Sequence, residues 1–202
     1  MLHFNAVPDS IRKLLRLLAP LPALEDFSLG GGTSLALRFG HRVSVDLDFF
    51  TTREFDTEQF VDQLGLAGAT LVNRATNSLT LDVHGTKLDF LRHAYPLLAP
   101  PEEIEGVRLL SLHDVAAMKL NAVANRGAKK DFFDLYELER HHSLPTMLEW
   151  FETKYLAADR FTVIRSLGWF EDAELEPDPV SLIGNDWQSV KTQLRSMVSK
   201  LA

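Results

Sequence analysis

Hydrophobic residues in the first half of the chain switch between helical and strand spacing. Residues 11–18 carry an isoleucine and leucines at helical spacing after Asp9 and Ser10, which are candidate caps, so a first helix is expected there. Residues 27–30 read as a short strand that runs into a turn, and a helix is expected just after the glycines that follow. Between residues 43 and 49 apolar and polar positions alternate, which indicates a half-buried strand.

The pattern then changes from strands to helices. A helix is expected over about 56–66, followed by two or three strands with a hairpin turn at either His84-Gly85 or Gly85-Thr86. Prolines interrupt the chain near residue 100. After them Ser111 is a candidate N-cap for the first of several helices, with Asp114 as its capping-box partner. These elements together predict an α+β fold.

The expected domains are a small mixed-sheet domain over residues 1–100 and a helical domain over residues 101–202.

Composition restricts the kinds of metal site and of cellular location that the chain could have. The chain has no cysteine, so a metal ion would need oxygen or imidazole ligands, and hard cations come first. No apolar run approaches the roughly 20 residues of a membrane span, and the N-terminus does not match a signal peptide, so a cytoplasmic protein without membrane contact is expected.

Charge is unevenly distributed along the chain. The net charge of -7 argues against a protein that coats nucleic acid by bulk electrostatics, although a local basic groove stays open. Residues 171–178 hold five acids and no base, and a solvated loop is the simplest interpretation of that run.

Two aspartates one residue apart are the first candidates for chemistry. With strand geometry Asp46 and Asp48 project from the same face, their Cα atoms roughly 6.5 to 7 Å apart, close enough to share a divalent ion. Without a cation the two carboxylates repel each other. An Asp-x-Asp pair is a weak signal when it stands alone.

The glycines before that strand offer a place for an anion. Three consecutive glycines let the backbone approach a ligand closely, and a helix that begins after them presents free N–H groups to a phosphate. Thr33 could add a hydroxyl. The alternative is a tight strand-to-helix turn, and the segment matches neither the P-loop nor the dinucleotide-binding fingerprint.

A third candidate carboxylate is flanked by apolar residues in the sequence. Asp89 lies among leucines and a phenylalanine in an expected strand, which is unusual for an acid. Three carboxylates would suit a two-metal nucleotidyl transfer site. Asp82 in the neighbouring strand competes with Asp89 for the third position, and Asp89 is preferred.

A lysine lies on an otherwise apolar helix face. At 100° per residue Lys119 falls inside the apolar arc of its helix, so it either extends past that arc to solvent or meets an anion such as a nucleotide phosphate. In the next helix Asp131 and Asp134 are three positions apart and could pair with Lys119, Arg126 or Lys130. A structural role and a catalytic role are equally open for either aspartate.

Two blocks of the sequence resemble a known family. "GGTSLALRFGHRVSVDLDFF" at 31–50 and "LHDVAAMKLNAVANRGAKKDFFDLYEL" at 112–138 are similar to the AbiEii/AbiGii toxin family of nucleotidyltransferases, within the DNA polymerase β-like superfamily. The resemblance implies a nucleotidyltransferase core in the first domain and a helical domain that contributes to the active site.

The resemblance also implies roles for individual positions. The implied nucleotide-binding residues are Gly31, Gly32, Thr33 and Lys119, with Arg42 and Ser44 shaping the site. The implied metal ligands are Asp46, Asp48 and Asp89, which would hold Mg²⁺, with two ions expected. Either Asp131 or Asp134 would supply the last catalytic acid, and the match does not choose between them.

The implied activity moves a nucleoside monophosphate from an NTP to an acceptor hydroxyl, with tRNA or another RNA as a candidate acceptor and a separate antitoxin as a candidate partner. Two alternatives remain. A haloacid dehalogenase-type phosphohydrolase would use the Asp-x-Asp, but Phe50 stands where that family wants threonine or valine. A binding module would keep the fold and contact nucleotide or RNA without turnover.

Overall fold

The computed structural model describes residues 1–201, which divide into a sheet unit and a helical unit. The sheet unit comprises residues 1–40, 44–96 and 100–110. Its elements are η1 (Phe4–Ala6), α1 (Asp9–Leu18), η2 (Pro22–Leu24), β1 (Ser28–Leu29), α2 (Gly31–Phe39), β2 (Leu47–Thr51), α3 (Thr57–Leu64), β3 (Ala69–Ala75), β4 (Ser78–Val83), β5 (Thr86–Arg92), β6 (Glu102–Ile104) and β7 (Val107–Leu109).

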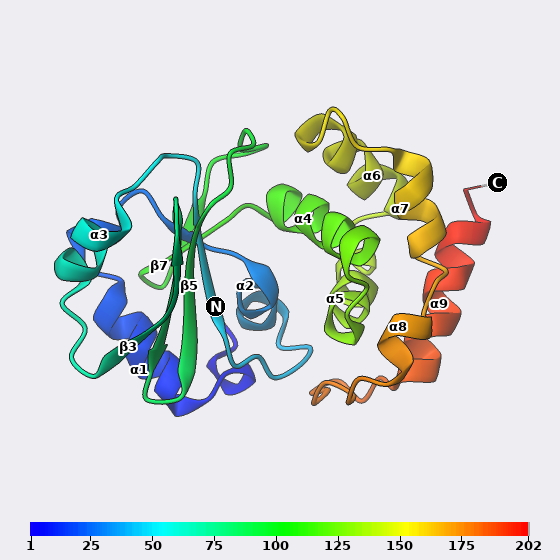
Figure 1. Cartoon of the computed structure of the whole chain (residues 1–202). Helices are drawn as coiled ribbons and strands as arrows, with labels where there is room; N and C mark the ends of the chain where they lie inside the picture. Colours follow the sequence, from blue (N-terminus) through cyan, green and yellow to red (C-terminus); the bar gives the residue numbers. More distant parts are fainter. Residues whose placement is uncertain (202) are drawn as a thin grey trace. The chain divides into compact units, whose positions relative to one another are not determined.

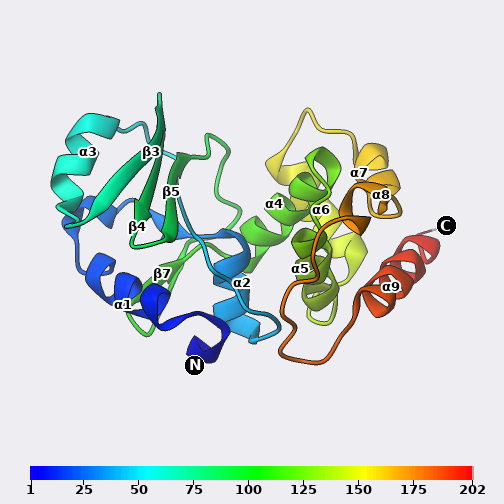
Figure 2. The same ribbon diagram turned by 60° about the horizontal axis from the view of Figure 1, so that its bottom comes forward.

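One seven-stranded mixed sheet forms the centre of this unit, in the order β3-β4-β5-β2-β1-β7-β6. The pairs β2/β5 and β1/β7 are parallel and the other neighbours are antiparallel, so the predicted mixed sheet is confirmed. In Figures 1 and 2, α1 and α3 lie on one side of the sheet and α2 lies on the other. The apolar strand residues that alternate with the aspartates, such as Phe49 and Phe90, are buried in the main hydrophobic cluster together with residues of α1 and α3.

Local boundaries differ from the prediction at two places. Helix α1 begins at Asp9, with Pro8 as its N-cap, so Asp9 and Ser10 lie within the helix. Strand β2 begins at Leu47 rather than at residue 43. The backbone before it binds other segments, because Val43 donates to the Val180 carbonyl and Ser44 donates to the Ala6 carbonyl. An alternating sequence pattern cannot show which partner its backbone groups will find.

The division between units falls at Leu110 rather than at residue 100. The β6–β7 hairpin extends the sheet, because β7 pairs with β1 in parallel and brings Leu109 opposite Leu29. Strands β6 and β7 have three residues each, which is too short for an alternation of apolar and polar positions to show in the sequence. The sheet unit therefore continues past the prolines that had suggested a boundary.

The helical unit comprises residues 41–43, residues 97–99 and the chain from residue 111 onward. Its helices are α4 (Leu112–Asn125), α5 (Lys129–Glu139), α6 (Leu144–Lys154), α7 (Arg160–Ser166), α8 (Glu171–Glu174) and α9 (Trp187–Ser199). None of the helices within residues 1–201 combines the length and the apolar character that crossing a bilayer requires.

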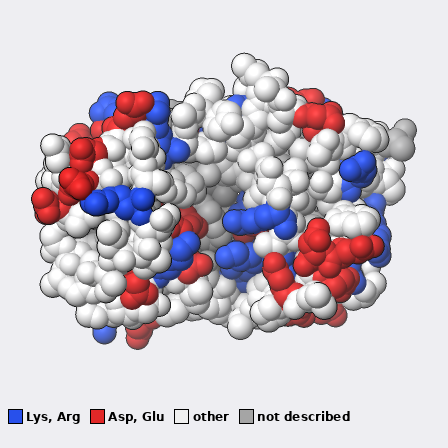
Figure 3. Space-filling model, viewed as in Figure 1, with Lys and Arg blue, Asp and Glu red and all other residues white. Residues whose placement is uncertain are grey.

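The acidic side chains of the run at 171–178 are exposed, as expected, but only the second half of the run is a loop. Its first half forms α8, where acidic side chains gather in Figure 3. Glu174 accepts hydrogen bonds from Trp187 Nε1 at 3.0 Å and Lys191 Nζ at 2.7 Å. Farther along, Asp178 accepts from the buried Lys129 at 2.9 Å. The run therefore fastens the α8–α9 segment to its own unit.

The predicted N-cap at Ser111 is confirmed, and Asp114 also binds groups outside the helix that Ser111 caps. Ser111 Oγ accepts from the Asp114 N–H, while the Asp114 carboxylate accepts from the Leu98 and Ala99 N–H groups. Lys154 Nζ lies 2.7 Å from Asp114 Oδ1, and both side chains are fully enclosed. This buried pair fixes the segment 97–99 within the helical unit.

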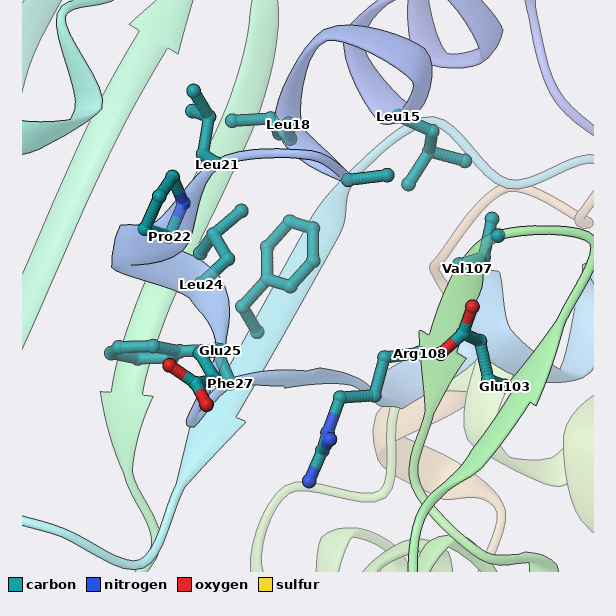
Figure 4. Close-up of a pocket in the computed structure, with 13 residues that line it drawn as sticks. Leu15, Leu18, Leu21, Pro22, Leu24, Glu25, Phe27, Glu103, Val107 and Arg108 are labelled. Atoms are coloured by element: carbon teal, nitrogen blue, oxygen red, sulfur yellow. The ribbon is translucent and has the colours of Figure 1, made fainter.

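A pocket of about 310 Å³ lies in the sheet unit against α1, η2 and β7 (Figure 4). Leu15, Leu18 and Phe49 line its apolar part, and Arg108 and Glu103 lie in the β6–β7 hairpin beside it. Because successive strand residues point to opposite faces, Phe49 and Asp48 face opposite sides of the sheet. The pocket is therefore separate from the carboxylate-bearing face.

Candidate active site

Two predicted carboxylates lie side by side on adjacent strands. Strands β2 and β5 are parallel, and their register places Asp48 directly opposite Asp89. Asp46 lies immediately before β2, two residues from Asp48. The order of the strands in the sheet cannot be read from the sequence, so the pairing of Asp48 with Asp89 is visible only in the structure.

Asp89 has a partner for each of its carboxylate oxygens. Thr80 Oγ1 on β4 donates to Oδ1 at 2.6 Å, and Lys87 Nζ lies 2.6 Å from Oδ2. The hydrogen bond to Asp89 raises the pKa of Lys87; burial opposes the rise, and the charges of Asp89, Asp48 and Asp46 add to it. This part of the sheet face is therefore strongly anionic.

The competing acid, Asp82, has a different environment. Its Oδ1 accepts from the Gly85 N–H at 2.9 Å and so closes the β4–β5 hairpin. That hairpin lies at His84 and Gly85, one of the two turns expected, and both residues have positive φ. Asp82 is opposite Lys87 on β5, whereas Asp89 is opposite Asp48 on β2. The geometry favours Asp89 as the third acid.

Gly31 gives the Asp48 carboxylate the room it needs. Gly31 has φ of +61°, and a Cβ placed there would lie 2.3 Å from Asp48 Oδ2. The neighbouring Gly30 N–H donates to the Asp48 carbonyl at 2.8 Å. Helix α2 begins at Gly31, so Gly31 and Gly32 form its first turn instead of preceding it. The start of α2 and the Asp48 side chain are thus in direct contact.

Thr33 and Ser44 hold the loop before the aspartates. Thr33 Oγ1 lies 2.8 Å from Ser44 Oγ and also contacts the Asp46 carbonyl. A hydroxyl has one proton, so when Thr33 donates to the carbonyl, Ser44 must donate to Thr33. Both side chains are buried. In this arrangement they orient Asp46, and the phosphate role expected of Thr33 stays a prediction.

In the helical unit, Asp134 accepts from three cationic or imidazole side chains. Arg42 approaches with two nitrogens, Nε at 2.7 Å from Oδ1 and Nη2 at 2.9 Å from Oδ2. His41 Nε2 lies 2.8 Å from Oδ1, and Lys119 Nζ lies 2.6 Å from Oδ2. Burial alone would raise the pKa of Asp134, but the charges of Arg42 and Lys119 and the bonds from His41 and Arg42 hold it well below its ordinary value.

Asp131 closes the same network. It lies 2.8 Å from Lys119 Nζ and accepts from Arg126 at 2.8 and 3.0 Å. Although burial opposes ionisation of both groups, attraction raises the pKa of Lys119 and lowers that of Asp131. The predicted pairs with Lys119 and Arg126 are confirmed, and the Lys119 ammonium does not extend to solvent, because it is buried between two carboxylates.

The donor set of the sheet face suits a hard cation. Asp46, Asp48 and Asp89 offer carboxylate oxygens, the ligands that Mg²⁺ prefers, and Gly31 keeps side-chain atoms away from the Asp48 oxygens. Within residues 1–201, however, no three histidine or acidic side chains are gathered in a geometry that would hold an ion. The three-ligand metal site stays a prediction.

Comparison with known proteins gives the family. A sequence profile described as nucleotidyl transferase AbiEii toxin, type IV toxin–antitoxin system, matches residues 12–82 and 81–200. The chain belongs to the AbiEii toxin family. An uncharacterized protein of Aquifex aeolicus (strain VF5) is 37% identical over 172 residues, which covers 82% of this chain and 84% of that protein.

Two solved structures share the fold of this AbiEii family protein. The nucleotidyltransferase toxin MenT4 from Mycobacterium tuberculosis H37Rv has a TM-score of 0.62 at 15% identity, covering 95% of this chain and 83% of its own. JHP933 from Helicobacter pylori has a TM-score of 0.57 at 20% identity, and the match covers 100% of this chain and 93% of the JHP933 chain. At these identities the likeness shows the fold, while family membership indicates nucleotidyltransferase activity in general and the divalent metal that such enzymes generally use.

Three residues of the AbiEii family protein contact the predicted site residues but were not predicted. Thr80 and Lys87 bind Asp89, and His41 binds Asp134. Lys87 is two positions before Asp89, so strand alternation places both on one face, and this signal was available in the sequence. The contact of Thr80 with Asp89 depends on the β4–β5 register, and the contact of His41 with Asp134 depends on the position of α5. No local sequence pattern reveals either of these.

Proposed function

We propose that this AbiEii family protein is an Mg²⁺-dependent nucleotidyltransferase that moves a nucleoside monophosphate from an NTP to an acceptor hydroxyl. The acceptor oxygen forms a bond to the α-phosphorus, the bond from that phosphorus to the bridging oxygen of the β-phosphate breaks, and pyrophosphate leaves. The observation that carries the proposal is the register of Asp48 opposite Asp89, with the Asp48 carboxylate seated against Gly31.

Each residue of the sheet face has a role in this proposal. Asp46 and Asp48 hold Mg²⁺, with Asp89 as the third carboxylate of the site. A bound Mg²⁺ would neutralise charge that develops on the triphosphate. Thr33 and Ser44 keep Asp46 oriented, and the N-terminal turn of α2, which has no side-chain cap, is suited to an anionic phosphate.

The proposed acceptor and the proposed partner are taken from the family resemblance. The proposed acceptor is an RNA 3′ end such as that of tRNA. The proposed partner is a separate antitoxin protein, which agrees with the toxin–antitoxin description of the matching family. Family membership also favours the nucleotidyltransferase over the phosphohydrolase alternative. Retained NTP binding without transfer to any acceptor would instead support the binding-module alternative.

The test compares two isosteric substitutions on one face of the sheet. The purified chain is incubated with Mg²⁺, each labelled NTP in turn and total RNA, and label in RNA is measured. Asp48→Asn removes the charge of a proposed metal ligand and is expected to lower transfer by about two orders of magnitude or more. Asp82→Asn changes a carboxylate that closes the hairpin, and it should keep transfer within about threefold of wild type. Equal transfer by wild type and Asp48→Asn would contradict the proposal.

A further inference from the structure

A lysine of its own strand covers Asp89. Lys87 and Asp89 lie on the same face of β5, and the ammonium is 2.6 Å from Oδ2. The Asp89 side chain is 11% exposed and the Lys87 side chain is 53% exposed. Thr80 takes the other oxygen at 2.6 Å. Both oxygens of Asp89 therefore have a proton donor before any ligand arrives.

The charges on this face favour one divalent ion over two. Lys87 contacts Asp89, Asp89 lies opposite Asp48 in the β2–β5 register, and Asp46 is two residues before Asp48. The positive charge of Lys87 offsets one of the three carboxylate charges, and a single divalent cation would balance the rest. An ion bound to Asp89 would need an oxygen at about 2.0–2.1 Å, the Mg²⁺ distance, and it would meet the ammonium as a like charge on the same carboxylate.

We propose that Lys87 stands in place of a second metal ion, so that the nucleotide-free protein binds one divalent cation through Asp46 and Asp48. This inference rests on the proposed function, because it assumes that those aspartates hold a metal. As long as no nucleotide is bound, one ion and one ammonium then take the place of the two ions expected for the site. Asp89 then serves in the free protein as the anchor of Lys87.

The experiment counts bound Mn²⁺ by electron paramagnetic resonance on the full chain without nucleotide. Wild type is expected to bind one ion. Lys87→Gln removes the positive charge and should either admit a second ion or tighten the first by about tenfold or more. Lys87→Arg keeps the charge and should bind one ion with wild-type affinity. Lys13→Gln makes the same charge change on an exposed lysine of α1 and serves as the control.

Two results would overturn the inference: two equivalent ions on wild type, or the same stoichiometry and affinity for Lys87→Gln and wild type. The Lys87→Arg result keeps the test decisive if the Gln variant folds poorly. Nucleotide transfer measured on the same samples separates this inference from the proposed function. If wild type transfers nucleotide and the Mn²⁺ titration of Lys87→Gln equals that of wild type, the inference about Lys87 is wrong and the proposed function stands. If wild type binds one ion but transfers no nucleotide, the proposed function is wrong and the inference about Lys87 stands.

Discussion

At the scale of single residues, close contacts of the candidate site leave little tolerance for added atoms. The Asp48 carboxylate occupies the place that a side chain at position 31 would take, and the positive φ of Gly31 disfavours any other residue. Two independent constraints, space and backbone conformation, therefore act on this one glycine. They can be separated experimentally because other glycines of the chain carry only one of them.

Gly31→Ala is expected to push the Asp48 carboxylate aside and to lower nucleotide transfer by about two orders of magnitude or more, at a stability cost of about 1–3 kcal/mol. Gly106→Ala is the matched control, because Gly106 has φ of +77° and nothing within 4 Å of its added Cβ. Transfer rates and urea unfolding of both variants are measured. Equal loss of activity in the two would show that backbone strain, rather than intrusion on Asp48, is responsible.

Prediction from the sequence succeeded for features of a residue that are set by a single strand or helix. Strand alternation put Asp89 in a strand, and helical periodicity found the inward-facing Lys119. Prediction failed where two elements meet. The register that sets Asp89 opposite Asp48 depends on strand order, and the buried partners of Lys119 depend on how α4 packs on α5.

At the scale of elements, one carboxylate ties three segments of the helical unit together. Asp134 on α5 holds Lys119 of α4 and both His41 and Arg42 of the segment 41–43. That segment also pairs with residues 180–182, because Arg42 forms a β-bridge with Ser181. Removing one charge from a buried network leaves its partners uncompensated, so the cost is large even though forming such a network adds little net stability.

Asp134→Asn is expected to lower the free energy of unfolding by about 3–5 kcal/mol at pH 7. The folded pKa of Asp134 is depressed, so its contribution is complete above the unfolded value near 3.9 and is lost as pH falls through the folded value. The difference between wild type and variant should stay constant at neutral pH and shrink below about pH 4. Urea unfolding from pH 3 to 8 measures it, with the exposed Asp62→Asn as control. A difference that grows in acid would refute the assignment.

At the scale of the whole molecule, the chain is not divided where its prolines suggest. The helical unit includes residues 41–43 and 97–99 from within the first half, and the sheet unit keeps residues 100–110. A sequence pattern shows where the character of the chain changes, but it cannot show that a three-residue segment belongs to a unit encoded farther along. A cut at residue 100 would therefore remove parts from both units.

The fragment 101–202 is expected to lose cooperative unfolding, because it lacks His41 and Arg42 and leaves Asp134 with Lys119 as its remaining cation among the contacts described. Near-ultraviolet circular dichroism and urea unfolding of the fragment and of the full chain measure this. A fragment 1–110 should retain more sheet structure than 1–100, because it keeps β7 against β1. Full-chain cooperativity in 101–202 would show that the segment 41–43 adds no stability there.

The pairing of β1 with β7 also bears on how fast the protein can reach its fold. Leu29 meets Leu109 across a parallel ladder, so the sheet cannot be completed until nearly all of the first 110 residues have been brought together. Closing such a long loop costs chain entropy before the contact repays it, and folds dominated by distant pairings reach the native state in milliseconds to seconds rather than microseconds. Strand β2, which carries Asp48, lies next to β1 in the sheet order. A newly made chain would therefore pass through a slow interval in which β1, the neighbour of β2, is an unfinished edge of the sheet.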